Sequence, residues 1–178
     1  MKIFTVDLPV AGFQAFACPG LSIVRADAVR DAGAVQRLVA ACAGEPAGMA
    51  PLPTPAGMTA ELQSRSGREV AAWLAWPQVS SGVPAGLVVL VAAGGANLPR
   101  WSIGWLLVNP AWRRQHVGMA LVATALQFAG ERGASVVYAE TLGRWPAAVA
   151  FWGAARLAAE RHVAKLLGSG ESRKTAEG

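Results

Sequence analysis

The sequence has few of the residues that build disulfide frameworks and metal sites. Its 178 residues include two cysteines, Cys18 and Cys42, and two histidines, His116 and His162. Two cysteines are too few to define a disulfide framework or a metal site, and two histidines cannot supply one either. We therefore expect no structural zinc and no metal among the functional residues.

Acidic residues are also scarce. The chain has 11 Asp and Glu against 16 Lys and Arg, which gives a formal net charge of +5. Such an excess suits an anionic ligand, and it would also suit nucleic acid. Because the arginines are scattered and form no basic stripe, we expect no nucleic-acid partner. An arginine-rich proteome explains the bulk of the excess equally well.

Long uncharged stretches are present, but they are broken. The stretch 70–99 carries no charge, yet Pro77 and Pro84, with small polar residues between them, split it into two short runs. Two short runs predict neighbouring strands, whereas a membrane helix needs about 20 apolar residues in succession. Near the N-terminus, Asp7 and Pro9 interrupt the apolar residues that a secretory signal would need. We therefore expect no membrane partner and a cytoplasmic location.

The composition is that of one folded domain. Hydrophobic residues make up 53% of the chain and charged residues 15%, which is typical of a globular rather than a disordered protein. A chain of this length is expected to build a single core. We predict an N-terminal extension over 1–20, a single domain over 21–167 and a flexible tail over 168–178, where the residues are small, polar and charged.

Apolar runs bounded by turn residues predict five strands. Three consecutive strands favour an antiparallel meander, and the later strand–helix–strand unit favours a parallel pairing. We therefore predict an α/β (α+β) fold with a mixed, mainly antiparallel sheet flanked by helices. The expected strands are 21–25, 68–76, 86–93, 100–108 and 135–141.

Helices are expected where apolar residues recur at helical spacing. Asp27 is expected to cap the first of them, and Pro146 suits the first turn of the last. Four prolines make 45–57 a loop, and Gly94-Gly95 marks a turn. The expected helices are 28–42, 59–64, 113–130 and 145–155.

The most informative stretch of the chain is 108–121. An apolar strand leads into it and an apolar helix leads out of it. The start of that helix combines exposed backbone N–H groups with a glycine, Gly118, and with the charges of Arg113 and Arg114. A helix start of this kind is a site for a diphosphate.

At the centre of this stretch, Gln115-x-x-Gly118-x-Ala120 resembles the acyl-CoA-binding motif of the GNAT superfamily of N-acetyltransferases, whose pattern is Gln/Arg-x-x-Gly-x-Gly/Ala. The resemblance covers 100–155 well and 21–45 loosely, and it implies acetyl-CoA as the cosubstrate. In the family, the strand before the loop binds the pantetheine arm like an added strand. That role would fall on Leu106, Leu107 and Val108. The family's phosphate loop maps onto Arg113, Arg114, Gln115, His116, Val117, Gly118, Met119 and Ala120.

A second signature of the family is an aromatic pair in the last helix, commonly Phe-Tyr after Ala. Here the run is Ala147-Ala-Val-Ala-Phe151-Trp152, which implies that the pair borders the cofactor and that Phe151 packs in the core. The Tyr of the family often acts as general acid toward the leaving thiolate. Trp152 cannot do so, because an indole N–H does not transfer its proton at neutral pH. Tyr138 or a water would take that role.

The general base of the family is often a Glu on the strand before the phosphate loop, but 100–108 contains no carboxylate. Glu69 and Glu140 are the two carboxylates inside predicted strands. Glu140 is the better candidate, because it shares a strand face with Tyr138 near the predicted cofactor cleft. A buried Glu can have its pKa raised toward that of a useful base. A structural pair with Arg144 is the alternative interpretation, and Ser102 or ordered water offers other routes to deprotonate an amine.

Two further departures bear on the completeness of the site. The position of His116 is often Gly in the family, and His116 either donates to a phosphate or is a solvated loop residue. The Gly-Phe that usually follows the aromatic pair, and leads into two last strands, is Arg156-Leu157 here. The run 157–167 fits either a continuing helix or one strand. If the helix forms, the sheet is short at its C-terminal edge.

The resemblance therefore implies an enzyme, a GNAT-type acyltransferase. It would move an acetyl group from acetyl-CoA to a primary amine of a small molecule or a protein by direct transfer. The alternative is a catalytically silent acyl-CoA-binding or protein-interaction module of the same fold. A homodimer is left open as the assembly.

Overall fold

The computed structural model describes residues 3–13, 18–43, 69–79, 82–93 and 100–171. Three of the predicted features, the loop over 45–57, the short helix over 59–64 and the turn at Gly94-Gly95, lie outside the described residues. So does the end of the chain over 172–178.

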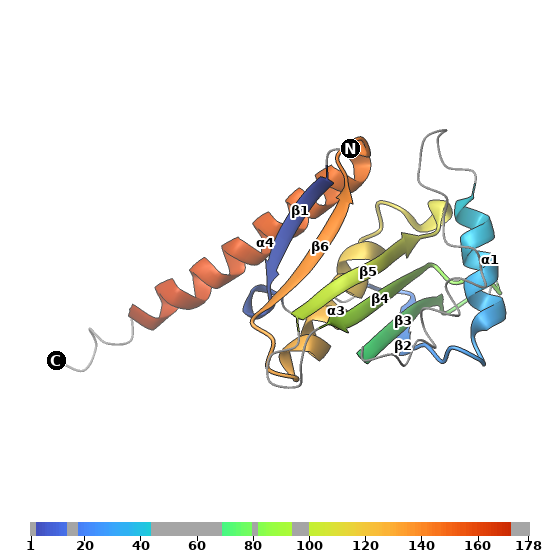
Figure 1. Ribbon diagram of the computed structural model, residues 1–178, viewed down its shortest axis with the longest axis horizontal. Coiled ribbons are helices and arrows are strands. Elements are labelled where there is room, and N and C mark those ends of the chain that lie inside the picture. Colours follow the sequence, from blue (N-terminus) through green and yellow to red (C-terminus); the bar gives the residue numbers. More distant parts are fainter. Residues whose placement is uncertain (1–2, 14–17, 44–68, 80–81, 94–99, 172–178) are drawn as a thin grey trace.

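Within the described residues, six strands form one sheet and three α-helices pack against it (Figure 1). Each of the five predicted strands matches an observed one to within one residue, and β1 is an additional strand. The strands are β1 (Ile3–Pro9), β2 (Leu21–Arg25), β3 (Glu69–Pro77), β4 (Gly86–Ala93), β5 (Arg100–Val108) and β6 (Val136–Leu142). The helices are α1 (Ala32–Cys42), α3 (Val117–Gly130) and α4 (Pro146–Glu171).

The sheet is mixed and mainly antiparallel, as predicted. Its strand order is β1-β6-β5-β4-β3-β2, and every ladder is antiparallel except that between β5 and β6. The strands β3, β4 and β5 form the expected meander. Parallel neighbours need a crossover connection, and α3 supplies it between β5 and β6.

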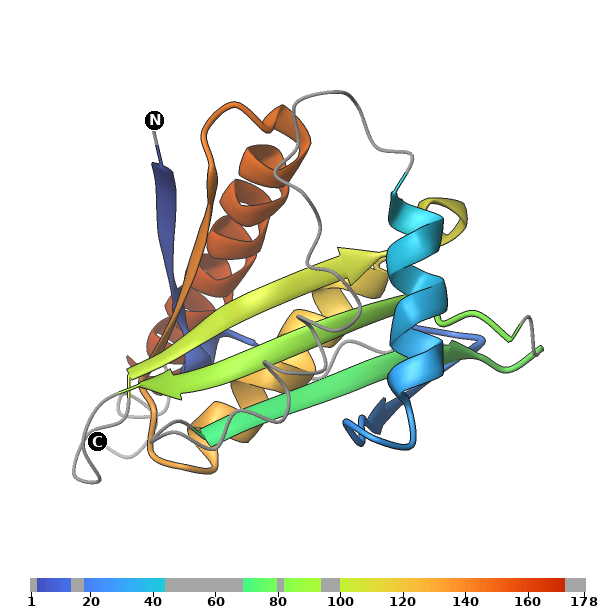
Figure 2. The ribbon, with the colours of Figure 1, turned by 45° about the vertical axis from the view of Figure 1, so that its right-hand side comes forward.

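Two apolar clusters pack on the two faces of the sheet. Figure 2 shows α1 on one face and α3 with α4 on the other. Trp101 and Leu121 are fully buried in the cluster on the α3 side, and Leu38 and Leu74 are fully buried in the cluster on the α1 side. Burial of apolar area on both faces fixes the orientation of β5, from which the phosphate loop emerges.

The predicted N-terminal extension contributes a strand of the same sheet. All seven residues of β1 pair with β6, and Val6 and Leu8 are buried in the core while Asp7 is exposed. The boundary expected after residue 20 therefore does not separate 3–9 from the domain. Because β1 lies at the edge of the sheet, Pro9 can end it without removing an inner ladder hydrogen bond.

The last helix is longer than predicted. Residues 157–167 continue α4, so the helical alternative for this run is confirmed and the strand alternative is excluded. The helix also includes 168–171, which we expected to belong to the flexible tail. No further strand follows the aromatic pair within the described chain, and the outer edge of β6 is occupied by β1 instead.

The first helix begins later than predicted. The carboxylate of Asp27 accepts hydrogen bonds from the N–H groups of Val29 at 2.9 Å and Arg30 at 2.7 Å, so it closes a turn rather than capping a helix. The helix α1 then starts at Ala32. None of the helices described is both long and apolar enough to cross a membrane.

Candidate functional site

The strands β5 and β6 part beside the predicted site. Their parallel ladder joins only residues 101–103 to 137–139. No ladder in the described chain joins 104–108 to β6, and Figures 1 and 2 show the two strands diverging from this point. The edge of β5 that β6 no longer covers includes the three residues expected to bind the pantetheine arm. An extended ligand could pair with it as an added strand does.

A glycine bulge lies where the strands part. In the ladder between β4 and β5, Val89 pairs with Trp105 and Leu90 pairs with Ile103, so Gly104 is an extra residue. The bulge changes which face the alternating side chains occupy: Ile103 belongs to the α3-side cluster, and Trp105 packs against the α1-side cluster. This bulge was not predicted from the sequence, although a glycine inside a strand is its usual sign.

The phosphate loop is a turn, not the first turn of a helix. Residues 113–116 form this turn, and α3 begins at Val117 rather than at Arg113 as predicted. Arg114 and His116 have φ angles of 61° and 62°, in the left-handed region that excludes a helix and favours glycine. The glycine that the family often has at the position of His116 therefore matches a backbone requirement.

The start of α3 presents main-chain donors. The N–H of Ala120 donates to the carbonyl of His116 at 3.0 Å, and the N–H groups of Val117, Gly118 and Met119 precede this first bond of the helix. Its first turn contains no acidic residue. The positive end of the helix dipole adds to the attraction for an anion. Since the side chains of Val117 and Ala120 are buried in the core, these two residues offer only their main chain.

Hydrogen bonds from side chains hold the loop in place. The Arg113 guanidinium donates from Nε and Nη2 to the carbonyl of Val108, at 3.3 and 3.4 Å. The amide of Gln115 donates to the carbonyl of Ala111 at 3.2 Å. The Sγ of Cys18, far away in the sequence, donates to the carbonyl of Gln115 at 3.1 Å. Arg113 and Gln115 therefore shape the loop. Cys18 also contributes to it, and no local pattern in the sequence indicates this contact.

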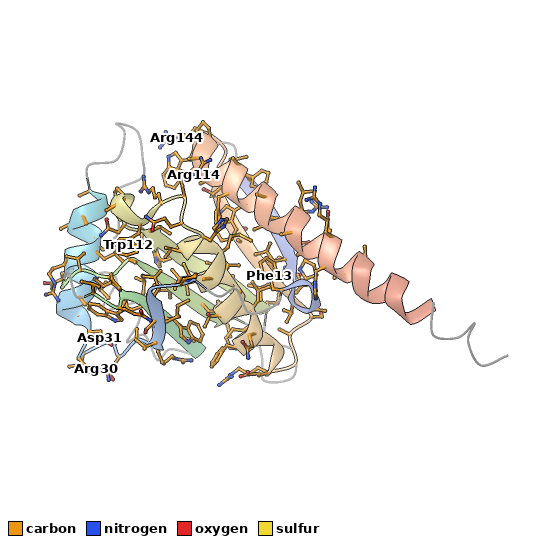
Figure 3. The ribbon with its side chains drawn as sticks, turned by 180° about the vertical axis from the view of Figure 1, so that it is seen from behind. Phe13, Arg30, Asp31, Trp112, Arg114 and Arg144 are labelled. Carbon is orange, nitrogen blue, oxygen red and sulfur yellow. The ribbon has the colours of Figure 1, made fainter. Side chains whose placement is uncertain are left out.

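The exposed side chains of the loop include those of Arg114 and His116. Arg114 forms no ion pair with any residue that the structure describes. Figure 3 shows Arg114 at the same end of the molecule as Arg144, which lies in the turn between β6 and α4. The end of the sheet at which β5 and β6 part therefore carries two exposed arginines.

Both residues of the aromatic pair pack on the α3-side core. Trp152 is 5% exposed and packs in the core, whereas Phe151 is only partly buried. The two rings meet edge to face, with centroids 5.0 Å apart. A Cβ on Gly118 would lie 3.0 Å from Cε2 of Phe151, so the ring packs against the start of α3. Phe151 packs against the core cluster as expected, and Trp152, within that cluster, is the more deeply buried of the two.

The two candidate acid–base residues lie on β6. Glu140 is exposed, so the burial on which our interpretation of it as a base relied is absent. Tyr138 is partly buried, and the guanidinium carbon of Arg100 lies 4.8 Å from the centre of its ring. The alternative pair of Glu140 with Arg144 is not among the ion pairs of the described residues. Ser102 is the residue opposite Tyr138 in the parallel ladder.

The cysteines and the acidic residues form no metal site in the described part of the chain. No group of three or more His, Cys, Asp or Glu comes together there in a way that could hold an ion. Both cysteines are free thiols, Cys18 partly buried and Cys42 fully. Burial raises the pKa of the Cys18 thiol above its ordinary value, which favours the protonated form that donates to the loop.

Solved structures share this fold. A tandem GNAT protein from the clavulanic acid biosynthesis pathway is 27% identical, with a TM-score of 0.59, over 73% of this chain and 42% of that protein. This chain thus spans less than half of that protein's length. An aminoglycoside acetyltransferase from an uncultured soil metagenomic sample is 18% identical over 77% of this chain and 88% of its own, with a TM-score of 0.58. AAC(6′)-Iy, in complex with the bisubstrate analog CoA-S-monomethyl-acetylneamine, is 15% identical over 76% of this chain and 88% of its own, with a TM-score of 0.55.

The sequence itself matches one family model, and no curated protein matches it. The match runs over residues 25–155, from the end of β2 through the phosphate loop to the residues just after the aromatic pair. It leaves out β1 and the second half of α4, the two parts in which the structure departs most from the expectation. This match, together with the parting strands and the helix start beside them, shows that the chain belongs to the GNAT family of acetyltransferases.

Proposed function

We propose that the protein transfers an acetyl group from acetyl-CoA directly to a primary amine of a small molecule or a protein. The observation that carries the proposal is the parting of β5 and β6 next to the start of α3. It sets an open strand edge beside a group of main-chain donors. An extended amide-containing arm that ends in a diphosphate has matching groups for both. The cytoplasmic location and the homodimer stay predictions.

In the proposed complex, the diphosphate lies on the N–H groups at the start of α3, with the charge of Arg114 beside it. Hydrogen bonds from neutral donors to an ionised phosphate are about twice as strong as those between neutral groups. The pantetheine arm lies along Leu106, Leu107 and Val108, and its thioester points toward the bulge at Gly104. An acceptor amine needs space beside the cofactor. The structure of AAC(6′)-Iy, which has this fold and holds a bisubstrate analog, supports such a space.

The proposed reaction is a direct nucleophilic substitution at the thioester. A neutral amine attacks the carbonyl carbon, and a main-chain N–H of β5, such as that of Leu106, stabilises the negative charge that develops on the carbonyl oxygen. Collapse of the tetrahedral intermediate breaks the C–S bond and releases the CoA thiolate. Much of the acceleration comes from holding both substrates in one orientation.

Two protons move in this reaction. One leaves the amine nitrogen, directly or through water, to a base for which Glu140 is the candidate on β6. The other reaches the thiolate from Tyr138 or from water. Because Glu140 is exposed, a water can lie between it and the amine, and the base then acts through that water.

A silent acyl-CoA-binding module is the second candidate function. Two observations favour it. No carboxylate lies in β5, and Trp152, at the position where the family often has a tyrosine as general acid, is buried in the core. Such a module would bind acetyl-CoA through the same loop and edge. It would differ in releasing no thiol in the presence of amines.

Calorimetric titration with acetyl-CoA tests the binding step. We expect the wild-type protein to bind with micromolar affinity and Arg114→Glu to bind at least about tenfold more weakly, because a charge at the diphosphate is reversed. Arg161→Glu, an equal charge change at an exposed position of α4, is the matched control and should bind like wild type. If Arg114→Glu binds acetyl-CoA as tightly as the wild type, the assignment of the phosphate loop to the cofactor site is wrong.

Release of CoA thiol in the presence of a panel of primary amines tests the transfer step. Release that depends on the amine establishes the enzyme. Binding without release by any amine of the panel, with both small-molecule and peptide amines included, would favour the silent module.

A further inference from the structure

Two helix starts meet at the end of the sheet where β5 and β6 part. Because the two strands are parallel, the helices that follow them both begin at this end. The contact between Phe151 and Gly118 holds the start of α4 against the start of α3. Neither first turn contains an acidic residue. The proposed cofactor site therefore has a positive helix end on each side, not only on the side of the phosphate loop.

Each side also carries an exposed arginine. Arg114 precedes α3 and Arg144 precedes α4, and Figure 3 shows both at one end of the molecule. Within the described residues neither arginine forms an ion pair, and the nearby carboxylate of Glu140 does not neutralise Arg144. Two exposed arginines without an ion pair in the described chain, one before each helix start, suit a ligand that carries anionic groups in two places.

The cosubstrate of the proposed function is such a ligand. CoA has a diphosphate in its chain and a separate phosphate on the 3′ oxygen of its ribose. The proposed function assigns the main-chain donors at the start of α3 to the first of these groups, which leaves the 3′-phosphate to other residues. A planar guanidinium binds a phosphate through two parallel hydrogen bonds, which suits an exposed phosphate at the rim of the site.

We propose that Arg144 binds the 3′-phosphate of CoA and makes the protein select CoA over 3′-dephospho-CoA. This inference rests on the proposed function, because it assigns a residue to the same cofactor. Arg144 is a binding residue on this assignment and takes no part in the transfer of protons or of the acetyl group. The sequence gives it no motif, since it lies outside the phosphate loop in a turn of two residues after β6.

The test compares the affinities of CoA and 3′-dephospho-CoA for four proteins: the wild type, Arg144→Gln, Arg114→Gln and the control Arg161→Gln. We expect Arg144→Gln to weaken CoA binding by about tenfold and to leave 3′-dephospho-CoA binding within about twofold of wild type. Arg114→Gln should weaken both ligands by a similar factor, because both contain the diphosphate. The control should change neither. Since Arg144 is exposed in a turn, its replacement should leave the thermal unfolding midpoint unchanged.

The outcomes separate this inference from the proposed function. If Arg144→Gln weakens both ligands equally, or weakens neither, Arg144 does not bind the 3′-phosphate, while the CoA site itself stands. If the wild-type protein does not distinguish the two ligands, the assignment fails in the same way. If the wild-type protein binds neither ligand, both the proposed function and this assignment are wrong.

Discussion

The ring of Phe151 in α4 lies so close to Gly118 in α3 that a Cβ on the glycine would come within 3.0 Å of Cε2 and 3.2 Å of Cζ. This contact seats the start of the last helix on the start of the helix that follows the phosphate loop. Gly118 is the glycine of the acyl-CoA motif, at the helix start predicted to bind a diphosphate. The structure gives it a packing function within the protein as well.

The packing of Phe151 on Gly118 predicts that replacement by alanine changes stability differently at Gly118 and at Gly153. In a helix, Gly→Ala normally stabilises by about 0.5–1 kcal/mol. We expect that gain for Gly153→Ala in α4, where nothing lies within 4 Å of the new Cβ. Gly118→Ala should fall short of it by about 1 kcal/mol or more, because the ring of Phe151 must move. Urea unfolding of both variants measures the difference. In a Phe151→Leu background the difference should shrink, and an unchanged difference would contradict the role of the ring.

The left-handed backbone of His116 predicts that glycine is more stabilising than alanine at this position, which is the reverse of the usual order in a helix. A non-glycine residue at a φ of 62° stores about 1–3 kcal/mol of strain, which exceeds the extra chain entropy of glycine. His116→Ala should therefore be less stable than His116→Gly by about 1 kcal/mol, because both variants lack the imidazole and differ only in the Cβ. Thermal unfolding of the two variants gives the order. Alanine more stable than glycine at this position would show that the turn is not left-handed in solution.

The part of the fold that carries the site was predictable because its signals are local. The apolar run before the loop predicts β5, and the apolar residues at helical spacing after it predict α3. The meander follows from three consecutive strands. The start of α3 was placed four residues too early. Left-handed φ values at Arg114 and His116 cannot be foreseen from residues that are ordinarily helical, whereas glycines there would have revealed the turn.

The features that could not be predicted depend on distant partners. Val6 and Leu8 alternate with Asp7 as a strand should, but the partner of this short run is β6, more than 120 residues later. The run 157–167 fits two periodicities, and packing of α4 against β1 and the core selects the helix. The relative burial of Phe151 and Trp152 likewise depends on how α4 is seated on α3, which no pattern within α4 specifies.

The burial of β1 predicts that this strand is necessary for stability. Leu8→Ala should lower the free energy of unfolding by about 2–5 kcal/mol, because the side chain is fully buried in the α3-side core. Ile3→Ala, in the same strand but 53% exposed, is the control and should cost less than about 1 kcal/mol. Denaturant unfolding measures both. Equal, small effects would mean that β1 is not packed on the sheet in solution.

The position of Glu140 at the end of β6 predicts a change in turnover that is separate from cofactor binding. As a general base, Glu140 is expected to contribute about a hundredfold, the lower end of the usual range, because it is exposed and acts through water. Glu140→Gln should then lower kcat by about that factor and leave the Kd of acetyl-CoA within about twofold. Glu131→Gln, an equal change at an exposed residue just after α3, should leave kcat as in wild type. If Glu140→Gln turns over like the control, the amine loses its proton to water without this residue, and Glu140 is only a surface residue of β6.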